Sequence, residues 1–211
     1  MKELKIIYRD DHLVVVIKPG GLLSVPGRGP ENSDCVSSRL QAKIPEMITQ
    51  PAVHRLDMYT SGLMVYAVSK EIHRALSIQF QEQQVDKKYT ALLEGCLQEV
   101  SGEIRLPFRV DLDNRPIQIL DYQHGKMGIT LWRKMDEKNG ITRVEFTPMT
   151  GRTHQLRVHA AHAKGLGIPI IGDSFYGSGR DGDEMMLHAH QLSFTHPIIG
   201  EKLYFKNDPD F

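Results

Sequence analysis

The sequence predicts an α+β fold with a mixed, largely antiparallel central sheet. Short runs rich in valine, isoleucine and aromatic residues outnumber helical patterns, and the two kinds of element do not alternate regularly along the chain. With 211 residues, 40% of them hydrophobic, the chain is long enough for one well-buried core. No repeat, low-complexity tract or linker interrupts it. We therefore expect a single domain over residues 1–211.

Strands are expected where β-branched and aromatic residues form short runs bounded by turn residues. The first two, Leu4–Tyr8 and Leu13–Lys18, are joined by a turn at Asp10-Asp11. The further strands expected are Gly62–Ser69, Lys87–Leu93, Glu103–Phe108, Ile129–Met135, Ile141–Thr147, Met186–Phe194 and Lys202–Phe205.

Three segments carry the apolar spacing of helices. The first follows Ser33, a residue type that caps helices, and ends at Pro45. The second, Lys70–Gln83, has one apolar stripe along its length, and the third is expected at His154–Lys164.

The composition is that of an ordinary soluble globular protein, and without an export signal the expected location is the cytoplasm. Lys plus Arg equals Asp plus Glu at 26 each, so the net charge is zero and any nucleic-acid partner would have to bind a local basic face. No apolar run approaches the roughly 20 residues that cross a bilayer, and the start, MKELKIIYRDD, has no signal-peptide core. Cys35 and Cys96 are too few for a disulfide framework and lack metal-ligand spacing.

Two N-terminal segments have the residue types of a site. KPGGLLSVPGRG, Lys18–Gly29, is a loop of small residues between basic ends, which suits close contact with phosphate; the alternative is a plain surface loop. In Pro51–Ala67 a polar cluster with Arg55 and Asp57 precedes a buried strand, and catalytic side chains often occupy such loops. The alternative there is a local Arg–Asp pair at a turn.

Two later segments carry further candidates. Tyr89 follows two lysines at a strand start and could stack on an unpaired base or simply join the core. In GRTHQLRVH, Gly151 and Arg152 open the expected helix and Arg157 follows five residues later, an arrangement that suits anions. The alternative is a capped amphipathic helix with solvated arginines.

Ten histidines raise the alternative of a metal-dependent hydrolase. His159 and His162 could share a helix face, and His188 and His190 a strand face, with His154 nearby. None of these pairs comes with an HExxH motif or a Cys/His knuckle, so no metal is expected. A second alternative is an RNA-binding protein without catalysis, which keeps the loops and arginines but gives Asp57 and Tyr89 no chemical task.

Taken together, the segments resemble the RluA-type family of pseudouridine synthases, which isomerise chosen uridines in structured RNA. The strings occur in the family's order: GLLSVPG, HRLDMYTSGLMV, KKYTALLEG, GRTHQLRVH, GIPIIGDSFYG and MLHAH before a strand ending in FTHP. The resemblance covers nearly the whole chain and implies the pseudouridine synthase catalytic fold, here without the N-terminal S4 domain of many relatives. With DNRPIQ and FKNDPDF, the chain resembles most the founding member, which modifies both large-subunit (23S) ribosomal RNA and the tRNA anticodon stem-loop.

The resemblance implies a role for each candidate in the reaction. Asp57 is the catalytic carboxylate, either as a nucleophile at C1′ or as a base at C2′, and Arg157 is the expected arginine partner that keeps it ionised. Tyr89 stacks on the flipped uracil. Because the reaction adds no group and involves no redox change, no cofactor is expected.

The remaining candidates are expected to bind substrate. Arg55 matches the arginine that enters the RNA helix where the base has left, and Leu156 matches an apolar residue of the uracil pocket. Lys18 and Arg152 are expected phosphate contacts. The partners are therefore ribosomal RNA, tRNA or both, with no membrane, and nothing demands more than a monomer.

Overall fold

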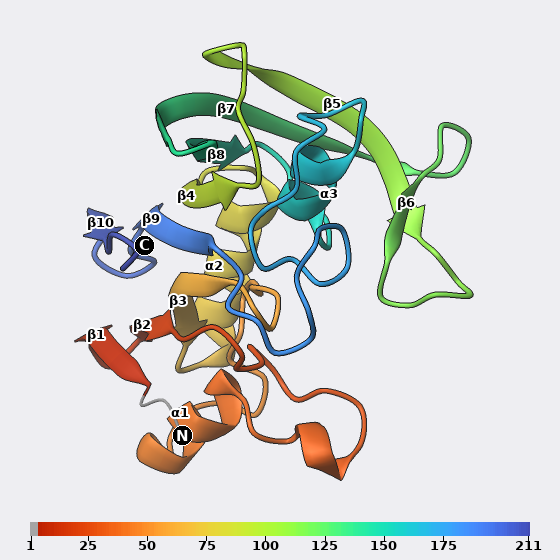
Figure 1. Cartoon of the computed structure of the whole chain (residues 1–211). Coiled ribbons are helices and arrows are strands. Elements are labelled where there is room, and N and C mark those ends of the chain that lie inside the picture. Colours follow the sequence, from red (N-terminus) through yellow and green to blue (C-terminus); the bar gives the residue numbers. More distant parts are fainter. Residues whose placement is uncertain (1–3) are drawn as a thin grey trace. The chain divides into compact units, whose positions relative to one another are not determined.

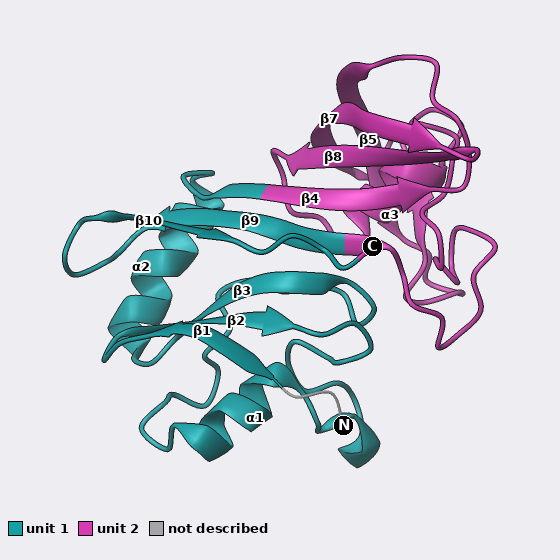
Figure 2. Ribbon diagram, turned by 60° about the vertical axis from the view of Figure 1, so that its left-hand side comes forward, with its two compact units in different colours: residues 1–87, 188–210 teal, residues 88–187, 211 magenta. Residues whose placement is uncertain are grey.

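The computed structural model describes residues 4–211. Residues 1–3, which begin the segment without an expected export signal, lie outside the described residues. The chain divides into two compact units. Unit 1 comprises residues 1–87 and 188–210, and unit 2 comprises residues 88–187 and 211 (Figure 2). Each unit has its own set of paired strands, and the single domain expected from the sequence stays a prediction.

Unit 1 contains one mixed set of paired strands. In chain order its elements are β1 (Lys5–Arg9), β2 (Leu13–Lys18), the 3-10 helix η1 (Pro30–Asn32), α1 (Val36–Lys43), β3 (Ser61–Ala67), α2 (Lys70–Gln81), β9 (Leu187–Thr195) and β10 (Lys202–Lys206). The strands β1, β2 and β3 pair antiparallel in that order, and β10 pairs antiparallel with β9. Strands β3 and β9 pair parallel, which joins the two sequence segments of the unit.

The core of unit 1 follows from the alternation of side chains along its strands. Leu13 and Val15 of β2 and Leu63 and Val65 of β3 are buried in one cluster that also contains apolar residues of α2 and β9. The α2 residues in this cluster, Ile72 and Leu76 among them, form the apolar stripe read from the sequence. The side chains on the opposite face of β2 and β3, including Tyr66, are also buried. The Tyr66 hydroxyl donates to Ser24 O at 3.1 Å, in the loop that leads to α1.

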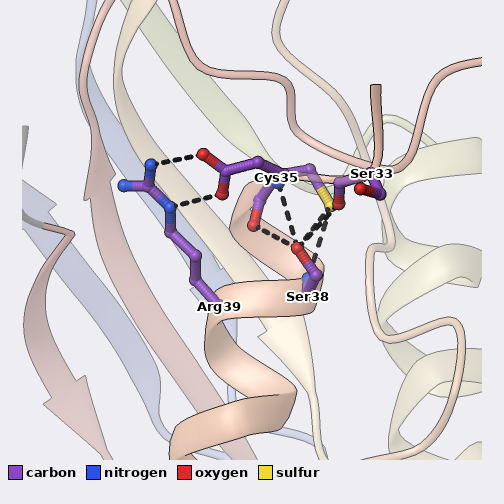
Figure 3. A network of polar contacts seen from close by, with 5 residues as sticks. Ser33, Cys35, Ser38 and Arg39 are labelled. Atoms are coloured by element: carbon purple, nitrogen blue, oxygen red, sulfur yellow. Dashed lines mark hydrogen bonds and ion pairs between the residues drawn. The ribbon is translucent and has the colours of Figure 1, made fainter. Parts of the chain in front are cut away.

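Helix α1 is capped by Cys35 and not by Ser33, so that expectation was wrong (Figure 3). The Cys35 Sγ accepts from the Ser38 N–H at 3.3 Å, and the Ser38 Oγ accepts from the Cys35 N–H at 3.0 Å. The Ser38 hydroxyl also lies 3.0 Å from Ser33 O, and Arg39 forms a bidentate pair with Asp34. A cysteine thus provides the reciprocal cap that serine and threonine usually provide, and the helix ends before Pro45 as expected.

Unit 2 is built on a wholly antiparallel set of strands. Its elements are β4 (Asp86–Leu93, whose first two residues belong to unit 1), β5 (Ser101–Val110), β6 (Gln118–Leu120), β7 (Lys126–Lys138), β8 (Ile141–Pro148) and α3 (Gln155–Ala161). The strand order is β4-β8-β7-β5-β6. Phe146 of β8 is opposite Tyr89 on one side and Trp132 on the other, which fixes the register at the centre of the unit.

Helix α3 begins three residues later than Arg152 and has only seven residues. His154 precedes it in a left-handed conformation with a φ of 56°, so Gly151 and Arg152 lie in the turn before the helix and do not open it. Gln155 fastens the helix to β7, because its amide Nε2 donates to Ile129 O and to Thr130 Oγ1, both at 2.9 Å.

The expected α+β class with a mixed, largely antiparallel pairing of strands is confirmed, as Figure 1 shows from red β1 to blue β10. Every expected strand and helix is present, with ends shifted by a few residues. The longest shift is at β7, which extends beyond Ile129–Met135 in both directions, and β6 was not expected. Within residues 4–211, none of the helices has the length and apolar character needed to cross a membrane.

Candidate active site

The candidate residues fall into two groups, one on each unit. Asp57, Arg55 and Lys18 belong to unit 1, and Tyr89, Arg152, Leu156 and Arg157 belong to unit 2. Each group is built around one charged side chain held by buried hydrogen bonds. In unit 1 this is Lys18, beside Asp57, and in unit 2 it is Arg157.

Asp57 lies in a loop between residues 54 and 60 that is fixed on both sides of the carboxylate. On one side, the buried Ser24 hydroxyl donates to Leu56 O at 2.7 Å, and the Leu56 N–H donates to Ser24 Oγ at 3.1 Å. On the other, the Thr60 N–H donates to Asp57 O at 3.2 Å, which closes a turn. The backbone that carries Asp57 is therefore held while its side chain stays partly exposed.

Lys18 fixes this loop through its ammonium group. The expectation that it contacts a phosphate of the RNA was wrong. Its side chain is completely buried, and its Nζ donates to Pro19 O, Leu22 O and Met58 O at 3.0, 2.7 and 2.8 Å. An ammonium has three hydrogens, and three carbonyl oxygens accept them, so none is left for a phosphate. Burial lowers the pKa of Lys18 to about 7, and the Asp57 carboxylate acts in the opposite direction. The role the structure gives Lys18 is to fix the loop of small residues and the Asp57 loop to each other.

Of the two residues before Leu56, His54 is partly buried and Arg55 is exposed. His54 Nε2 accepts from the Val65 N–H at 3.1 Å, and its ring stacks on Phe80 with 4.5 Å between centroids. Burial, with a smaller effect of the Lys87 charge, lowers the pKa of His54 to about 3, so the ring is neutral and structural. Arg55 is exposed, as a side chain that enters an RNA helix has to be.

The exit of the Asp57 loop is fixed to β9. Ser61 and Gly62 pair with His188 and Ala189, and the Ser61 hydroxyl lies 2.7 Å from His188 Nδ1. Gly62 has a φ of 115°, and a Cβ at this position would lie 2.4 Å from Ala189 O. Only glycine fits both the conformation and the space.

In unit 2, Arg157 is clamped by Asp173. Its Nε and Nη2 donate to the two carboxylate oxygens at 2.8 and 2.6 Å, and the side chains are 2% and 0% exposed. Asp173 Oδ1 also accepts from the N–H groups of Phe175 and Tyr176, whose ring centroids lie 5.0 and 5.2 Å from the guanidinium carbon. The guanidinium orientation is therefore fixed within the unit, and the alternative of a solvated arginine is wrong for Arg157.

The other unit 2 candidates lie on β4, on α3 and in the segment before α3. Tyr89 is partly buried on β4, and Leu156 is buried on α3, one residue before Arg157. Arg152 is exposed, and its Nε donates to Met127 O at 3.3 Å. It remains accessible to a phosphate, unlike Lys18.

The histidines that suggested a metal take part in the hydrogen bonding of the fold. His154 Nδ1 lies 2.9 Å from the Tyr176 hydroxyl, and His159 Nδ1 lies 2.9 Å from the Thr130 hydroxyl. His162 Nδ1 accepts from a backbone N–H at 3.0 Å. In the described part of the chain, no three His, Cys, Asp or Glu side chains are grouped so that they could hold a metal ion.

Comparisons with known proteins identify the family to which the chain belongs. Residues 12–162 match the family model described as RNA pseudouridylate synthase. The chain is 45% identical to the dual-specificity RNA pseudouridine synthase RluA of Haemophilus influenzae, and 42% identical to that of Escherichia coli strain K12. Each match covers 99% of this chain and 94% of the relative. Among solved structures, human RNA pseudouridylate synthase domain containing 1 is similar with a TM-score of 0.79 and 29% identity, over 100% of this chain and 85% of that one.

The fold and the family match define an RNA-modifying isomerase, a pseudouridine synthase that acts on uridines in RNA. This chain belongs to the RNA pseudouridylate synthase family and, within it, to the RluA type. The family expected from the ordered strings of the sequence is thus confirmed.

Sequence reasoning missed the residues that hold the candidates in place. Asp173 stood in the quoted string GIPIIGDSFYG but was given no role, because an aspartate beside glycine reads as a turn former and not as the partner of a buried arginine. Ser24 and Ser61 gave no signal beyond their presence in loops. His188 was considered only as a metal ligand.

Proposed function

We propose that Asp57 is the catalytic carboxylate of this synthase and that Tyr89 and Arg157 are its further catalytic residues. The reaction breaks the N1–C1′ bond, turns the base and joins C5 to C1′. The hydrogen on C5 leaves, N1 gains one, and the product is an isomer of the substrate. No step of this balance needs a group or an electron from outside.

The observation that carries the proposal is the support of Asp57 within unit 1. The backbone on both sides of it is fixed by buried donors, Ser24 before it and Lys18 after it, while the carboxylate itself stays partly exposed. A catalytic group needs this combination, because reactivity depends on a defined position and on access to substrate. A turn-forming aspartate needs neither.

The target uridine has to leave its RNA stack before Asp57 can reach it. Arg55, exposed two residues before Asp57, is suited to take the place of the flipped base, because a guanidinium can stack on bases and bond to phosphate at once. Leu156 and Tyr89 provide an apolar contact and an aromatic ring for the uracil, and Arg152 an exposed charge for phosphate.

For the RNA substrates, we propose both large-subunit ribosomal RNA and the tRNA anticodon stem-loop. The support is the 42–45% identity, over nearly the full length, to relatives whose names state dual specificity. Since both RNAs occur in the cytoplasm, we propose that the enzyme acts there, as a monomer.

The test is release of tritium from tRNA and ribosomal RNA transcripts labelled at uracil C5, because isomerisation must expel that hydrogen. We expect release by the wild type from both RNAs and none by Asp57→Asn, which keeps the shape of the side chain but cannot attack or accept a proton. Asp136→Asn is the matched control, since Asp136 is an exposed aspartate on β7 outside the candidate site. It should release tritium at the wild-type rate.

Three outcomes would contradict parts of the proposal. Full activity of Asp57→Asn would show that another residue performs the chemistry. Release from only one RNA would exclude dual specificity. Binding of both RNAs without release would favour an RNA-binding protein that lacks catalysis.

A further inference from the structure

A second hydrogen-bonded chain in unit 1 links the Asp57 loop to the segment after β10. The Ser61 hydroxyl, four residues after Asp57, lies 2.7 Å from His188 Nδ1. On the other side of the ring, His188 Nε2 lies 3.0 Å from the backbone oxygen of Asn207 and 3.1 Å from its side-chain Oδ1. The Asn207 N–H in turn donates to His190 O at 2.8 Å, which fixes this segment to β9.

The chemistry of these atoms sets the direction of each hydrogen bond. A backbone carbonyl oxygen can only accept, so His188 Nε2 must carry a hydrogen and donate it to Asn207. In a neutral imidazole the other nitrogen then has a lone pair, and Nδ1 can only accept. The Ser61 hydroxyl must therefore donate to His188, which fixes its rotamer and turns its lone pairs away from the ring.

Protonation of His188 would break this order. A charged ring donates from both nitrogens, so the Ser61 hydroxyl would have to rotate its hydrogen away from His188. Burial is the main cause that lowers the pKa of His188, and the nearby His190 lowers it further, while the two contacts with Asn207 and the charge of Asp210 raise it. Among the described residues, the polar groups that influence the charge of the ring therefore lie on β9, on the segment after β10 and, through Ser61, on β3.

We propose that Ser61, His188 and Asn207 form a positioning relay that fixes the exit of the Asp57 loop, with His188 acting in its Nε2–H form. The relay rests on the proposed role of Asp57, because its effect on the reaction acts through that loop. Ser61 is the first residue of β3 and pairs with His188, so a change in its hydrogen bond is transmitted to the turn closed between Asp57 and Thr60. Ser61, His188 and Asn207 are positioning residues, and Asp57 does the chemistry.

The test is Asn207→Asp in the full chain, with tritium release measured as a function of pH. A carboxylate beside Nε2 favours the charged imidazolium, so we expect the acid limb of kcat to move upward by about one pH unit or more. KM for the RNA should change much less than kcat, because the relay acts at the exit of the loop, whereas the backbone next to Arg55 is fixed separately by Ser24. Asn139→Asp, in the β7–β8 turn, adds the same charge far along the chain and should leave the profile at that of the wild type.

Two double variants show whether the shift comes from the relay. In His188→Gln/Asn207→Asp no imidazole is left to titrate, and in Ser61→Ala/Asn207→Asp no hydroxyl is left to rotate, so the upward shift should be lost in both. A shift that persists in either would overturn the relay, as would Asn207→Asp with the acid limb of the wild type.

The relay can also be tested apart from the reaction. The nitrogen chemical shifts of His188 in the isotopically labelled wild type report which ring nitrogen carries the hydrogen. A neutral ring with its hydrogen on Nδ1 would overturn the relay even if the enzyme is active. If no RNA releases tritium, the proposed function fails, and the chemical shifts still decide whether the hydrogen-bond order holds.

Discussion

Replacing Asp173 by asparagine removes the negative charge from the clamp around Arg157 with almost no change of shape. Both side chains of the pair are buried, and two short hydrogen bonds join them. Removing one partner of such a pair costs about 3–5 kcal/mol, because the other charge keeps its desolvation cost. For a chain of this size, each kcal/mol lowers Tm by about 2–4 °C, so Asp173→Asn should lower Tm by roughly 6–20 °C.

The assay is thermal and urea denaturation of Asp173→Asn beside Asp136→Asn. Asp136 pairs with Arg143 at 3.2 Å and its side chain is 62% exposed, so its loss should cost less than about 1 kcal/mol. Tritium release at a temperature where both variants are folded should show a lower kcat only for Asp173→Asn, because Arg157 loses its fixed orientation. Equal stability of the two variants would refute the reasoning, since it would mean that the Asp173 charge does not stabilise the buried guanidinium.

Two further predictions concern unit 1 and the pH dependence of folding. Gly62→Ala should destabilise the protein by more than about 2 kcal/mol in urea denaturation, because its Cβ would meet the Ala189 backbone, whereas Gly140→Ala, with a φ of 77° and open space, should cost less. Burial lowers the pKa of His54 to about 3 and that of His159 to about 4. As the pH falls below about 6.5, these histidines therefore bind protons in the unfolded chain but stay neutral in the folded chain. The free energy of unfolding should therefore fall from about pH 6.5 to about pH 4, by about 1.4 kcal/mol per pH unit for each histidine, and less steeply in His159→Asn; a flat profile in the wild type would contradict this.

The order and type of the elements could be predicted because they follow from local patterns. The α2 stripe and the β2 run are readable from the sequence because each element buries a fixed face. The predicted cap residue of α1 was wrong because a cysteine sulfur takes the place of the usual oxygen acceptor. The prediction that Gly151 and Arg152 open α3 was wrong because His154, between them and the helix, has a left-handed conformation. The apolar periodicity of the sequence does not reveal such a conformation.

The candidate site was predictable as a set of residues and not as a set of contacts. Asp57 and Arg157 stand in strings that carry the family resemblance. Their supports come from distant parts of the chain: Ser24 for the Asp57 loop, Asp173 for Arg157 and Asn207 for His188. Lys18 shows the same difference, since a lysine in a glycine-rich loop suggests phosphate contact and only the three-dimensional structure reveals that carbonyl oxygens already accept its hydrogens.

The parallel pairing of β3 with β9 also determines when unit 1 can complete its fold during synthesis. Unit 1 begins within the first 87 residues but takes its last strands from residues 188–210, after residues 88–187 of unit 2 have been made. Domains fold from the N-terminus as the chain emerges from the ribosome. The edge of β3 that pairs with β9 therefore stays unpaired while about a hundred further residues are added, at some 5–20 residues per second. The loop that carries Asp57 is completed only then, so a nascent or prematurely ended chain has the aspartate but not the strand that fixes it.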